Sequence, residues 1–216
     1  TVGAGLPINS TIKELLNSGD KISEISGIFS GTLSWLFQYY DGVKPFSTLL
    51  SDALSQGITE PDPREDLSGR DVQRKLLILA RAAGFELSLS DINCQSLVPE
   101  PLRNISLTEF LERTSELDEM FLSRLKQAQD KACVIRYVAR FTYDNEKIMA
   151  KVSLEELSEK DAFAQLTPCD NVFQLKSEWY QENALIIRGP GAGRDVTAGG
   201  IHADLVTICQ RLNHRY

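Results

Sequence analysis

The sequence has 216 residues, of which 42% are hydrophobic, and it carries a formal net charge of −7 at pH 7. A chain of this length can build one sizeable core, burying about 70% of the surface that its unfolded form exposes. The acidic balance and the lack of a basic stripe argue against a nucleic-acid partner. No apolar run reaches the length of a membrane span, and no stretch has the features of a secretory signal.

The cysteines also limit the class of protein to which the chain can belong. Cys94, Cys133, Cys169 and Cys209 are far apart, form no CxxC pair and are accompanied by only two histidines, which argues against zinc. Four cysteines could pair in a secreted protein, but dispersed cysteines in a chain of this size are more typical of buried free thiols in a reducing cytoplasm. We therefore expect a cytoplasmic protein. Because the chain opens inside a motif without a methionine, we also expect a domain taken from a longer protein.

In chain order, residues 1–7 hold two glycines and a proline, which favour a fixed loop. An ordinary turn and a loop with inward-pointing carbonyls are about equally compatible with this composition. A capped apolar pattern ending at Gly19 predicts the first helix, and residues 21–29 predict a strand. Gly31 and Thr32 then open a second helix. Its free N–H groups and hydroxyls can receive a carboxylate or phosphate, although simple capping is the commoner use.

A third helix follows Pro45 and ends near Gly57, and the segment 57–75 comes next. Its prolines Pro61 and Pro63 predict a stiff, non-helical approach over residues 59–66. Ser68 or Asp66 is expected to cap the following helix, whose apolar positions continue to residue 83. The segment is therefore predicted to be a rigid loop that leads into a long helix.

Asp71 and Lys75 lie four residues apart and so share one face of that helix. Glu60 and Asp66, from the rigid loop, are expected to converge on the same place. An isolated Asp/Lys pair of this spacing is usually an exposed ion pair worth under about 1 kcal/mol. Several polar groups around a stiff loop and a helix start instead suit a small substrate with an amine and a hydroxyl.

The last third of the chain changes character. Residues 87–98 predict a loop with a short strand, and 107–114 and 117–131 predict two helices with solvated charged faces. A hairpin over 134–154 and strands at 171–177 and 184–188 follow. Helices followed by strands indicate an α+β fold. We predict a mixed, mostly antiparallel sheet with helices on one face and the other face available for dimerisation.

A Gly-rich turn at 189–193 leads into a helix predicted over 195–212. A strand, a Gly-rich turn and a helix start can cradle an anion, and the same glycines can equally serve a tight turn. The pattern is not a complete dinucleotide fingerprint, since it is not GxGxxG and no acid follows about 20 residues on. His202 is expected at a packing or surface position, and His214 in a frayed tail.

Four motifs carry a resemblance to a known family. They are, in chain order, TVGAGLP at residues 1–7, SGIFSGTLS at 26–34, TEPDPREDLSGRDVQRK at 59–75 and GPGAGRDVTAG at 189–199. Together they resemble homoserine dehydrogenases over essentially the whole chain. The similarity is strongest to the dehydrogenase half of the bacterial bifunctional aspartokinase/homoserine dehydrogenases, particularly the methionine-branch isoenzyme. Glu65, where the family usually has aspartate, is a mild local departure.

The resemblance implies an enzyme of amino-acid biosynthesis that interconverts L-homoserine and L-aspartate 4-semialdehyde with NADP or NAD. It matches Lys75 to the catalytic lysine and Asp71 to the residue that orients it. Glu60 and Asp66 match carboxylates that bind the amino-acid end of the substrate, and Thr32 matches a hydroxyl beside it. The reaction expected from these residues is acid–base catalysis at the reacting oxygen.

The resemblance also implies bound groups. Gly31 and Gly193 match positions near the nicotinamide cofactor. The backbone oxygens of Val2, Ala4 and Leu6 match ligands of a sodium ion, together with an acid that lies upstream in the family.

The family's N-terminal NAD(P)-binding Rossmann domain has no counterpart in residues 1–216, so this chain corresponds to the catalytic, substrate-binding and dimerisation domain. We expect the chain alone to be inactive and to bind NADP weakly or not at all. A homodimer through the sheet is also implied. Two alternatives are a non-catalytic dimerisation module and an unrelated α+β regulatory domain. The preference between NADP and NAD depends on residues in the missing domain.

Overall fold

The computed structural model describes residues 2–213, so Thr1 and His214 lie outside the described residues. Its six strands form a single sheet in the order β2-β4-β3-β1-β5-β6. The strands are β1 (Ile22–Ile28), β2 (Asn93–Cys94), β3 (Cys133–Asp144), β4 (Lys147–Ser158), β5 (Asp170–Ser177) and β6 (Leu185–Pro190). Within this sheet only β2 and β4 pair in parallel, so the predicted mixed, mostly antiparallel α+β sheet is confirmed.

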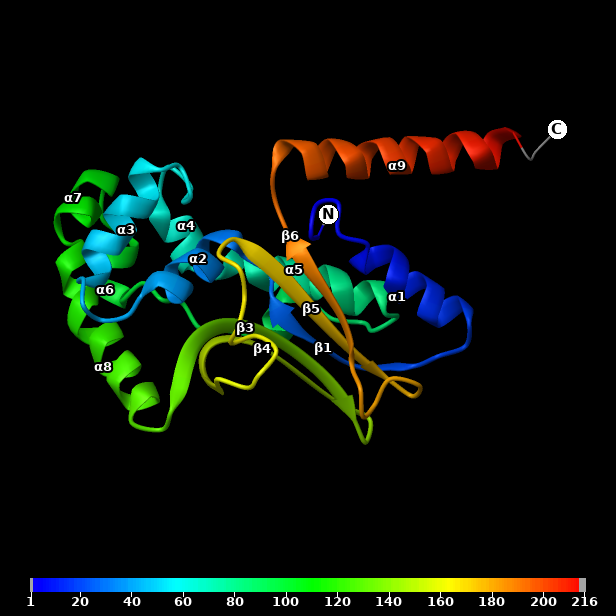
Figure 1. Cartoon of the computed structure of the whole chain (residues 1–216), viewed down its shortest axis with the longest axis horizontal. Helices are drawn as coiled ribbons and strands as arrows, with labels where there is room; N and C mark the ends of the chain where they lie inside the picture. Colours follow the sequence, from blue (N-terminus) through cyan, green and yellow to red (C-terminus); the bar gives the residue numbers. More distant parts are fainter. Residues whose placement is uncertain (1, 214–216) are drawn as a thin grey trace.

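Most of the helices lie in the first half of the chain, where β1 is followed by α2 to α5 in succession, and the predicted helices are all found. The helices are α1 (Ile8–Asn17), α2 (Gly31–Tyr39), α3 (Phe46–Ser55), α4 (Pro63–Leu67), α5 (Arg70–Ala82), α6 (Glu100–Arg103), α7 (Leu107–Glu112), α8 (Asp118–Gln129) and α9 (Arg194–Asn213). Figure 1 shows α1 and α5 on one side of the sheet and the bundle of α2, α3, α7 and α8 beside it.

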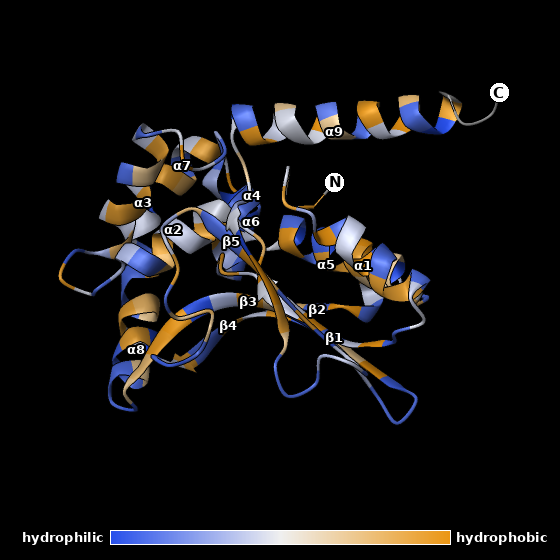
Figure 2. Cartoon of the chain, turned by 45° about the vertical axis from the view of Figure 1, so that its right-hand side comes forward, coloured by the Kyte–Doolittle hydropathy of each residue, from blue (hydrophilic) through white to orange (hydrophobic). Residues whose placement is uncertain are grey.

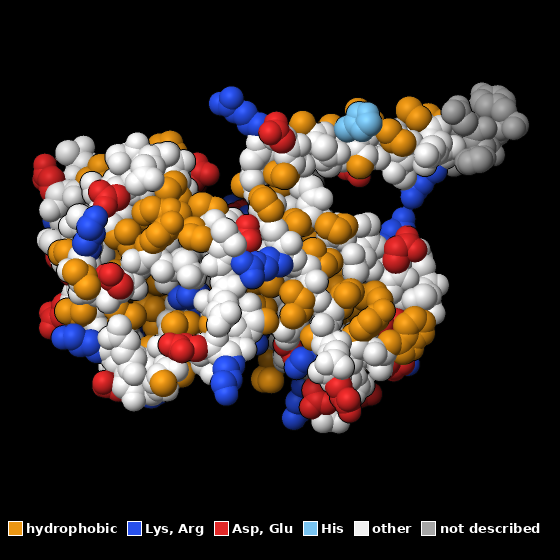
Figure 3. Space-filling view, in the orientation of Figure 1, with side chains coloured by type: hydrophobic (Ala, Val, Ile, Leu, Met, Phe, Trp, Pro, Cys, Tyr) orange, Lys and Arg blue, Asp and Glu red, His pale blue; other side chains and the backbone are white. Residues whose placement is uncertain are grey.

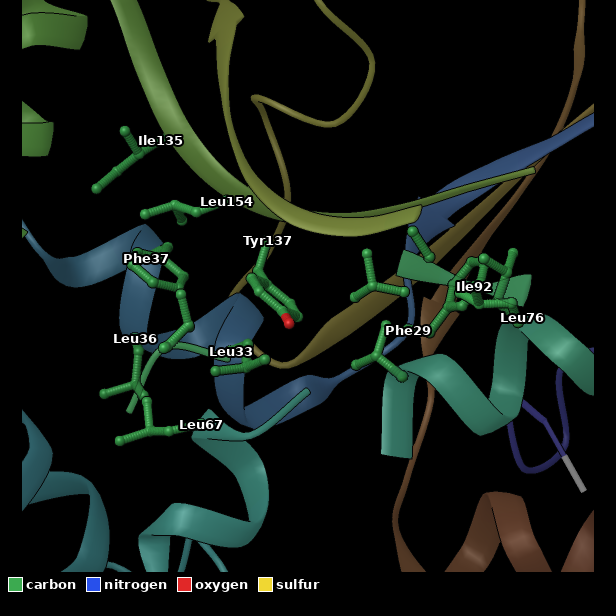
Figure 4. Close-up of a cluster of buried hydrophobic side chains, with 14 of the residues drawn as sticks. Phe29, Leu33, Leu36, Phe37, Leu67, Leu76, Ile92, Ile135, Tyr137 and Leu154 are labelled. Atoms are coloured by element: carbon green, nitrogen blue, oxygen red, sulfur yellow. The ribbon is translucent and has the colours of Figure 1, made fainter. Parts of the chain in front are cut away.

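One face of the sheet carries the core. Inward-facing side chains such as Ile25, Tyr137 and Phe173 are nearly inaccessible to solvent and pack in one cluster with side chains of the helices. Figure 4 shows Tyr137 reaching from β3 toward Leu33 of α2, with Leu76 of α5 in the same cluster. Burying apolar surface of this kind contributes about 25 cal/mol per Å². The core therefore fixes the relative positions of α2 and α5, which carry the candidate site.

The opposite face of the sheet is only partly covered. Phe163 and Leu166, from the segment between β4 and β5, pack on Ile28, Val138 and Val172 in a small second cluster. The rest of this face carries charged side chains. Glu24 pairs with Arg140 at 3.9 Å and with Lys176 at 2.9 Å, and Arg140 also pairs with Glu155 at 2.8 Å. The prediction of helices on one face with the other face uncovered holds except where this segment packs.

The C-terminal helix α9 stands out from the body of the molecule (Figure 1). Its apolar side chains are exposed, with Ile201, Leu205, Ile208 and Leu212 each more than half accessible. Figures 2 and 3 show these hydrophobic residues along its length. The helix is anchored at its first turns, where a methyl group on Gly5 would overlap the carbonyl of Val196. No helix in residues 2–213 is long and apolar enough to cross a membrane.

Two local predictions around segment 57–75 were wrong. Residues 59–66 are not entirely non-helical, because Pro63 begins the short helix α4. Proline is tolerated at a first helical position, and the Asp62 side chain caps this turn by accepting the Arg64 N–H at 3.0 Å. The N-cap position of α5 is neither Ser68 nor Asp66, although the Ser68 hydroxyl accepts the Arg70 N–H at 3.3 Å. The N-cap is Gly69, which has a left-handed φ of 71°.

The cysteines are free thiols in the described part of the chain, as predicted, but the expectation that they are buried is wrong. Cys94 and Cys133 are half-buried, and Cys169 and Cys209 are exposed. His202 lies at the surface on α9.

Candidate functional site

The start of α2 meets the loop before α4. Ser30 caps α2 by accepting the Leu33 N–H at 3.2 Å, which leaves Gly31 and Thr32 in the first turn. The Thr32 hydroxyl donates to the Ile58 carbonyl at 2.8 Å. This contact ties two segments of the chain together, so Thr32 lies beside the loop that carries Glu60 and leads into α4, on which Asp66 lies.

Asp66 is the centre of a carboxylate cluster. Its Oδ2 accepts the Glu60 N–H at 2.9 Å, which fixes the predicted convergence of these two residues. Burial raises the pKa of Asp66, and the nearby carboxylates of Glu60 and Asp71 raise it further, although the hydrogen bond from the Glu60 N–H and the nearby Thr32 hydroxyl oppose the shift. The cluster therefore favours a positively charged ligand group, which would relieve the repulsion between the carboxylates.

The Lys75 side chain is more buried than that of its ion-pair partner Asp71. Its Nζ is 2.8 Å from Asp71 Oδ2, and the lysine side chain is 22% exposed whereas that of Asp71 is 61% exposed. The same Nζ donates to the Phe29 carbonyl at 2.9 Å. The pair is thus not an ordinary exposed ion pair, because the ammonium is held against the end of β1 as well as by its carboxylate.

A groove of about 900 Å³ lies beside the Asp71–Lys75 pair, and it is lined by Asp71 but not by Lys75. Glu60, Asp66 and Asp71 contribute acidic side chains to its lining. Its basic lining residues are Arg64, Arg70, Arg74 and Arg103. Sequence reasoning did not single out these arginines. Arg103 comes from α6, far along the chain, and no local pattern places it here.

The Gly-rich turn after β6 reaches the same region through Asn171. The Asn171 Nδ2 donates to the Phe29 carbonyl at 3.3 Å, so this carbonyl has two donors. A methyl group on Gly191 would overlap the Asn171 amide. Gly31 also lies close to the start of β5, since a methyl group on Gly31 would be 3.3 Å from the Cys169 carbonyl. Gly193 has a φ of 131° that favours glycine.

The opening loop lies against α9 and close to the Gly-rich turn, since a methyl group on Gly189 would be 3.2 Å from the Leu6 side chain. Val2 is buried, Ala4 has a left-handed φ of 49°, and the Leu6 carbonyl accepts the Ile8 N–H at 2.9 Å. Residues 2–213 contain no group of three or more His, Cys, Asp or Glu side chains placed to hold a metal ion. Any cation on this loop would therefore depend on backbone oxygens alone within the described chain.

We expect Asp66→Asn to stabilise the fold at pH 7. Because the folded pKa of Asp66 is raised, its stabilising contribution is complete below the unfolded pKa of about 3.9 and is lost as the pH rises through the folded value. Asparagine can still accept the Glu60 N–H but carries no charge. Thermal unfolding should show a higher Tm than wild type at pH 7 and no difference near pH 3. The exposed control Asp204→Asn should change neither value, and a lower Tm for Asp66→Asn at pH 7 would contradict the assignment.

The chain is similar to known proteins over almost its whole length. The family model described as Homoserine dehydrogenase matches residues 7–206. The chain is 52% identical over 212 residues to bifunctional aspartokinase/homoserine dehydrogenase 2 of Escherichia coli, covering 98% of this chain and 26% of that protein. It is 42% identical to the homoserine dehydrogenase of Paracoccidioides brasiliensis, covering 99% of this chain and 59% of that protein. The chain thus spans only part of the length of these relatives.

Solved structures share the fold. A Candida auris protein described as being of unknown function is 41% identical with a TM-score of 0.92, covering 98% of this chain and 60% of that one. A putative homoserine dehydrogenase from Archaeoglobus fulgidus is 25% identical with a TM-score of 0.74, covering 96% and 57%. A hyperthermophilic archaeal homoserine dehydrogenase mutant, described in complex with NADPH, is 23% identical with a TM-score of 0.69, covering 98% and 54%. On the extent of the family match and the identity to its members, the chain belongs to the homoserine dehydrogenase family.

Proposed function

We propose that this chain is the substrate-binding catalytic domain of an NAD(P)-dependent homoserine dehydrogenase, which interconverts L-homoserine and L-aspartate 4-semialdehyde. The observation that carries the proposal is the half-buried Lys75 ammonium, held at 2.8 Å by Asp71 beside a carboxylate cluster. Such a site offers negative charge for a substrate amine and a proton donor for a substrate oxygen.

The substrate fits the cluster by charge. The α-ammonium group of homoserine would bind Glu60 and Asp66, whose carboxylates already lie close together. The Thr32 hydroxyl would contact the substrate beside these carboxylates, and to donate to the substrate it would have to give up its hydrogen bond to the Ile58 carbonyl. The reacting oxygen, at the other end of the substrate, would then lie near Lys75. This arrangement uses every acidic residue that sequence reasoning selected in segment 57–75.

The chemistry at the oxygen is proton transfer. As the aldehyde is reduced, negative charge grows on its oxygen, and the Lys75 ammonium stabilises this charge and then donates a proton. In the reverse direction Lys75 accepts the proton from the alcohol. Asp71 keeps the lysine oriented. A positioned acid or base of this kind contributes about 10²–10⁴-fold to the rate.

NADP or NAD supplies the hydride when it is bound. The residues present fit an approach of the cofactor from the Gly-rich turn. Gly31 and Gly193 have no side chain that would block a cofactor. The Gly-rich turn packs on Asn171 beside the Phe29 carbonyl. Residues 2–213 have no complete dinucleotide fingerprint, so we propose that a separate dinucleotide-binding domain of the full-length protein holds most of the cofactor. We expect the 216-residue chain alone to show no turnover, which an assay of NADPH oxidation with aspartate semialdehyde measures.

A sodium ion on the backbone oxygens of Val2, Ala4 and Leu6 remains a prediction. The described loop offers those carbonyls, but that of Leu6 already accepts a hydrogen bond from Ile8. No step of the proposed reaction depends on this ion.

Calorimetric titration of L-homoserine into the 216-residue chain tests the substrate assignment. We expect binding that weakens at least about tenfold in Asp66→Asn, because a charge-assisted hydrogen bond is lost. Norvaline, which lacks the hydroxyl, and 4-hydroxybutyrate, which lacks the amine, should each bind more weakly than homoserine. Binding that is equal for all three ligands, or unchanged by Asp66→Asn, would contradict the proposed pocket.

A dimerisation role is a second function that a specific observation favours. On the uncovered face of the sheet, the charges of Glu24 and Glu155 are neutralised by neighbouring basic residues and are only 16% and 13% exposed. A face with few free charges is suited to burial against a second copy of the chain. We propose a homodimer through this face, and both roles can belong to the same domain.

We expect Gln174→Arg to break that dimer. Gln174 lies opposite Ser26 in the β1–β5 register and is half-buried on the uncovered face, so an arginine there would place an unpaired charge in the interface. Sedimentation at micromolar concentration should give a dimer for wild type and for the loop control Glu182→Arg, and a monomer for Gln174→Arg. A wild-type monomer, or a variant that remains dimeric, would contradict the interface.

A further inference from the structure

The Phe29 carbonyl connects two parts of the molecule by accepting a hydrogen bond from each. Phe29 follows the last residue of β1, and its carbonyl accepts Lys75 Nζ at 2.9 Å from α5 and Asn171 Nδ2 at 3.3 Å from β5. Its side chain is buried and stacks on Phe173 with ring centroids 4.8 Å apart. The peptide that receives both donors is therefore held by packing on one side and by Asn171 on the other.

Asn171 is placed for this one bond. It is 1% exposed, and its Oδ1 has no hydrogen-bond partner among the described residues. A buried polar atom without a partner destabilises a fold, so an apolar side chain of similar shape would cost little or even stabilise the protein. The stability of the fold thus does not explain why this position is an asparagine. The hydrogen bond from Nδ2 to the Phe29 carbonyl does explain it.

The surroundings of Asn171 prevent the amide from turning away. Gly191 packs directly on it, and a methyl group at that position would overlap the amide. Cys169, two residues earlier, has a left-handed φ of 70°, an unfavourable conformation for cysteine that the neighbouring structure maintains. Both features keep the amide directed at the Phe29 carbonyl.

We propose that Asn171 is a positioning residue for Lys75, acting through the Phe29 carbonyl, and that the Gly-rich turn holds Asn171 in place. The proposal rests on the proposed dehydrogenase function. Lys75 can transfer a proton only while its Nζ stays within hydrogen-bond reach of the substrate oxygen. The amide fixes the carbonyl that, with Asp71, fixes Nζ. A displacement of about 1 Å in such a group can cost about a hundredfold in rate.

Steady-state kinetics of the full-length protein test this role. Asn171→Leu keeps the approximate shape but removes the donor, and kcat should fall about tenfold to a hundredfold while KM for homoserine changes less than about threefold. In a Lys75→Ala background the same substitution should lower the residual kcat no further, because the residue it positions is gone. Additive losses in the double variant would overturn the proposal, since they indicate a general structural effect.

Two matched variants separate positioning from stability. Ser177→Ala removes another buried polar side chain, at the opposite end of β5, where its Oγ accepts the Tyr180 N–H at 3.2 Å. It should lower Tm but leave kcat unchanged. Gly191→Ala displaces the Asn171 amide without removing it and should lower kcat as Asn171→Leu does, which provides a test if the leucine variant fails to fold. Gly199→Ala, where a methyl group meets nothing within 4 Å, should leave kcat unchanged.

A readout that needs no turnover distinguishes this proposal from the proposed function. In the 216-residue chain with ¹³C-carbonyl-labelled phenylalanine, loss of either donor should move the Phe29 carbonyl resonance upfield, in Asn171→Leu and in Lys75→Met alike. If the full-length protein shows no homoserine oxidation but this shift occurs, the proposed function fails and the shared hydrogen bond stands. An unchanged Phe29 resonance in Asn171→Leu would overturn the positioning role whatever the activity.

Discussion

Lys75→Ala is expected to lower kcat for homoserine oxidation by about 10²–10⁴-fold in the full-length protein. The substitution removes the only group for which we propose proton transfer at the reacting oxygen. Its partner Asp71 is 61% exposed, so the freed carboxylate can be solvated and the fold should survive. The Phe29 carbonyl also keeps one donor, from Asn171. The loss should therefore fall on kcat, with Tm within a few degrees of wild type.

Steady-state rates and thermal unfolding measured on the same preparations check this result. The control Lys13→Ala removes an exposed lysine on α1 and should change neither kcat nor Tm. A decrease in kcat of less than tenfold for Lys75→Ala, in a folded protein, would mean that another group transfers the proton.

Arg136→Met is expected to destabilise the fold by about 1–3 kcal/mol, the cost of leaving buried acceptors without a donor. Arg136 is 5% exposed, and its hydrogen bonds within residues 2–213 go to carbonyl and amide oxygens. Its guanidinium donates to the carbonyls of Phe37 and Ala164 at 2.8 and 2.7 Å, and also to Ile135 and Gln38. Methionine fills a similar volume but leaves these acceptors buried without donors. Because Phe37 is in the last turn of α2, the cation also stabilises that end of the helix dipole.

Burial lowers the pKa of Arg136 to about 10, which still leaves it charged at neutral pH. Urea unfolding at pH 7 measures the expected loss. The control Arg124→Met, at an exposed position on α8, should change the free energy of unfolding by less than about 0.5 kcal/mol. A loss below about 1 kcal/mol for Arg136→Met would show that water replaces the guanidinium at these acceptors.

Sequence reasoning succeeded where the relevant interactions are local. The spacing of Asp71 and Lys75 placed them on one face of a helix, and the structure joins them at 2.8 Å. Alternation and turn residues predicted the hairpin of β3 and β4 closely. Both results depend on backbone periodicity, which a few neighbouring residues determine.

The parts that could not be predicted depend on contacts between distant segments. Asn171 reaches the Phe29 carbonyl across 142 positions of the chain, and nothing in the local sequence indicates it. Gly69 is the N-cap of α5, and a methyl group there would overlap the Tyr137 hydroxyl from β3. The cap is thus decided by tertiary packing, and the local preference for Ser68 or Asp66 is overridden.

Among the function classes considered, an unrelated regulatory domain is excluded by the family membership. The proposed catalytic and dimerisation roles are compatible, since they would use different faces of the molecule. The site lies where α2, α5 and the Gly-rich turn meet, and the charged face of the sheet lies on the other side of the strands.

The most direct test of the central claim is a crystal structure of this chain with L-homoserine. The account predicts the ligand in the groove, with its ammonium group within hydrogen-bond distance of Glu60 and Asp66 and its hydroxyl within reach of Lys75 Nζ. A ligand bound with its carboxylate toward Asp66, or bound away from segment 57–75, would contradict the proposed site.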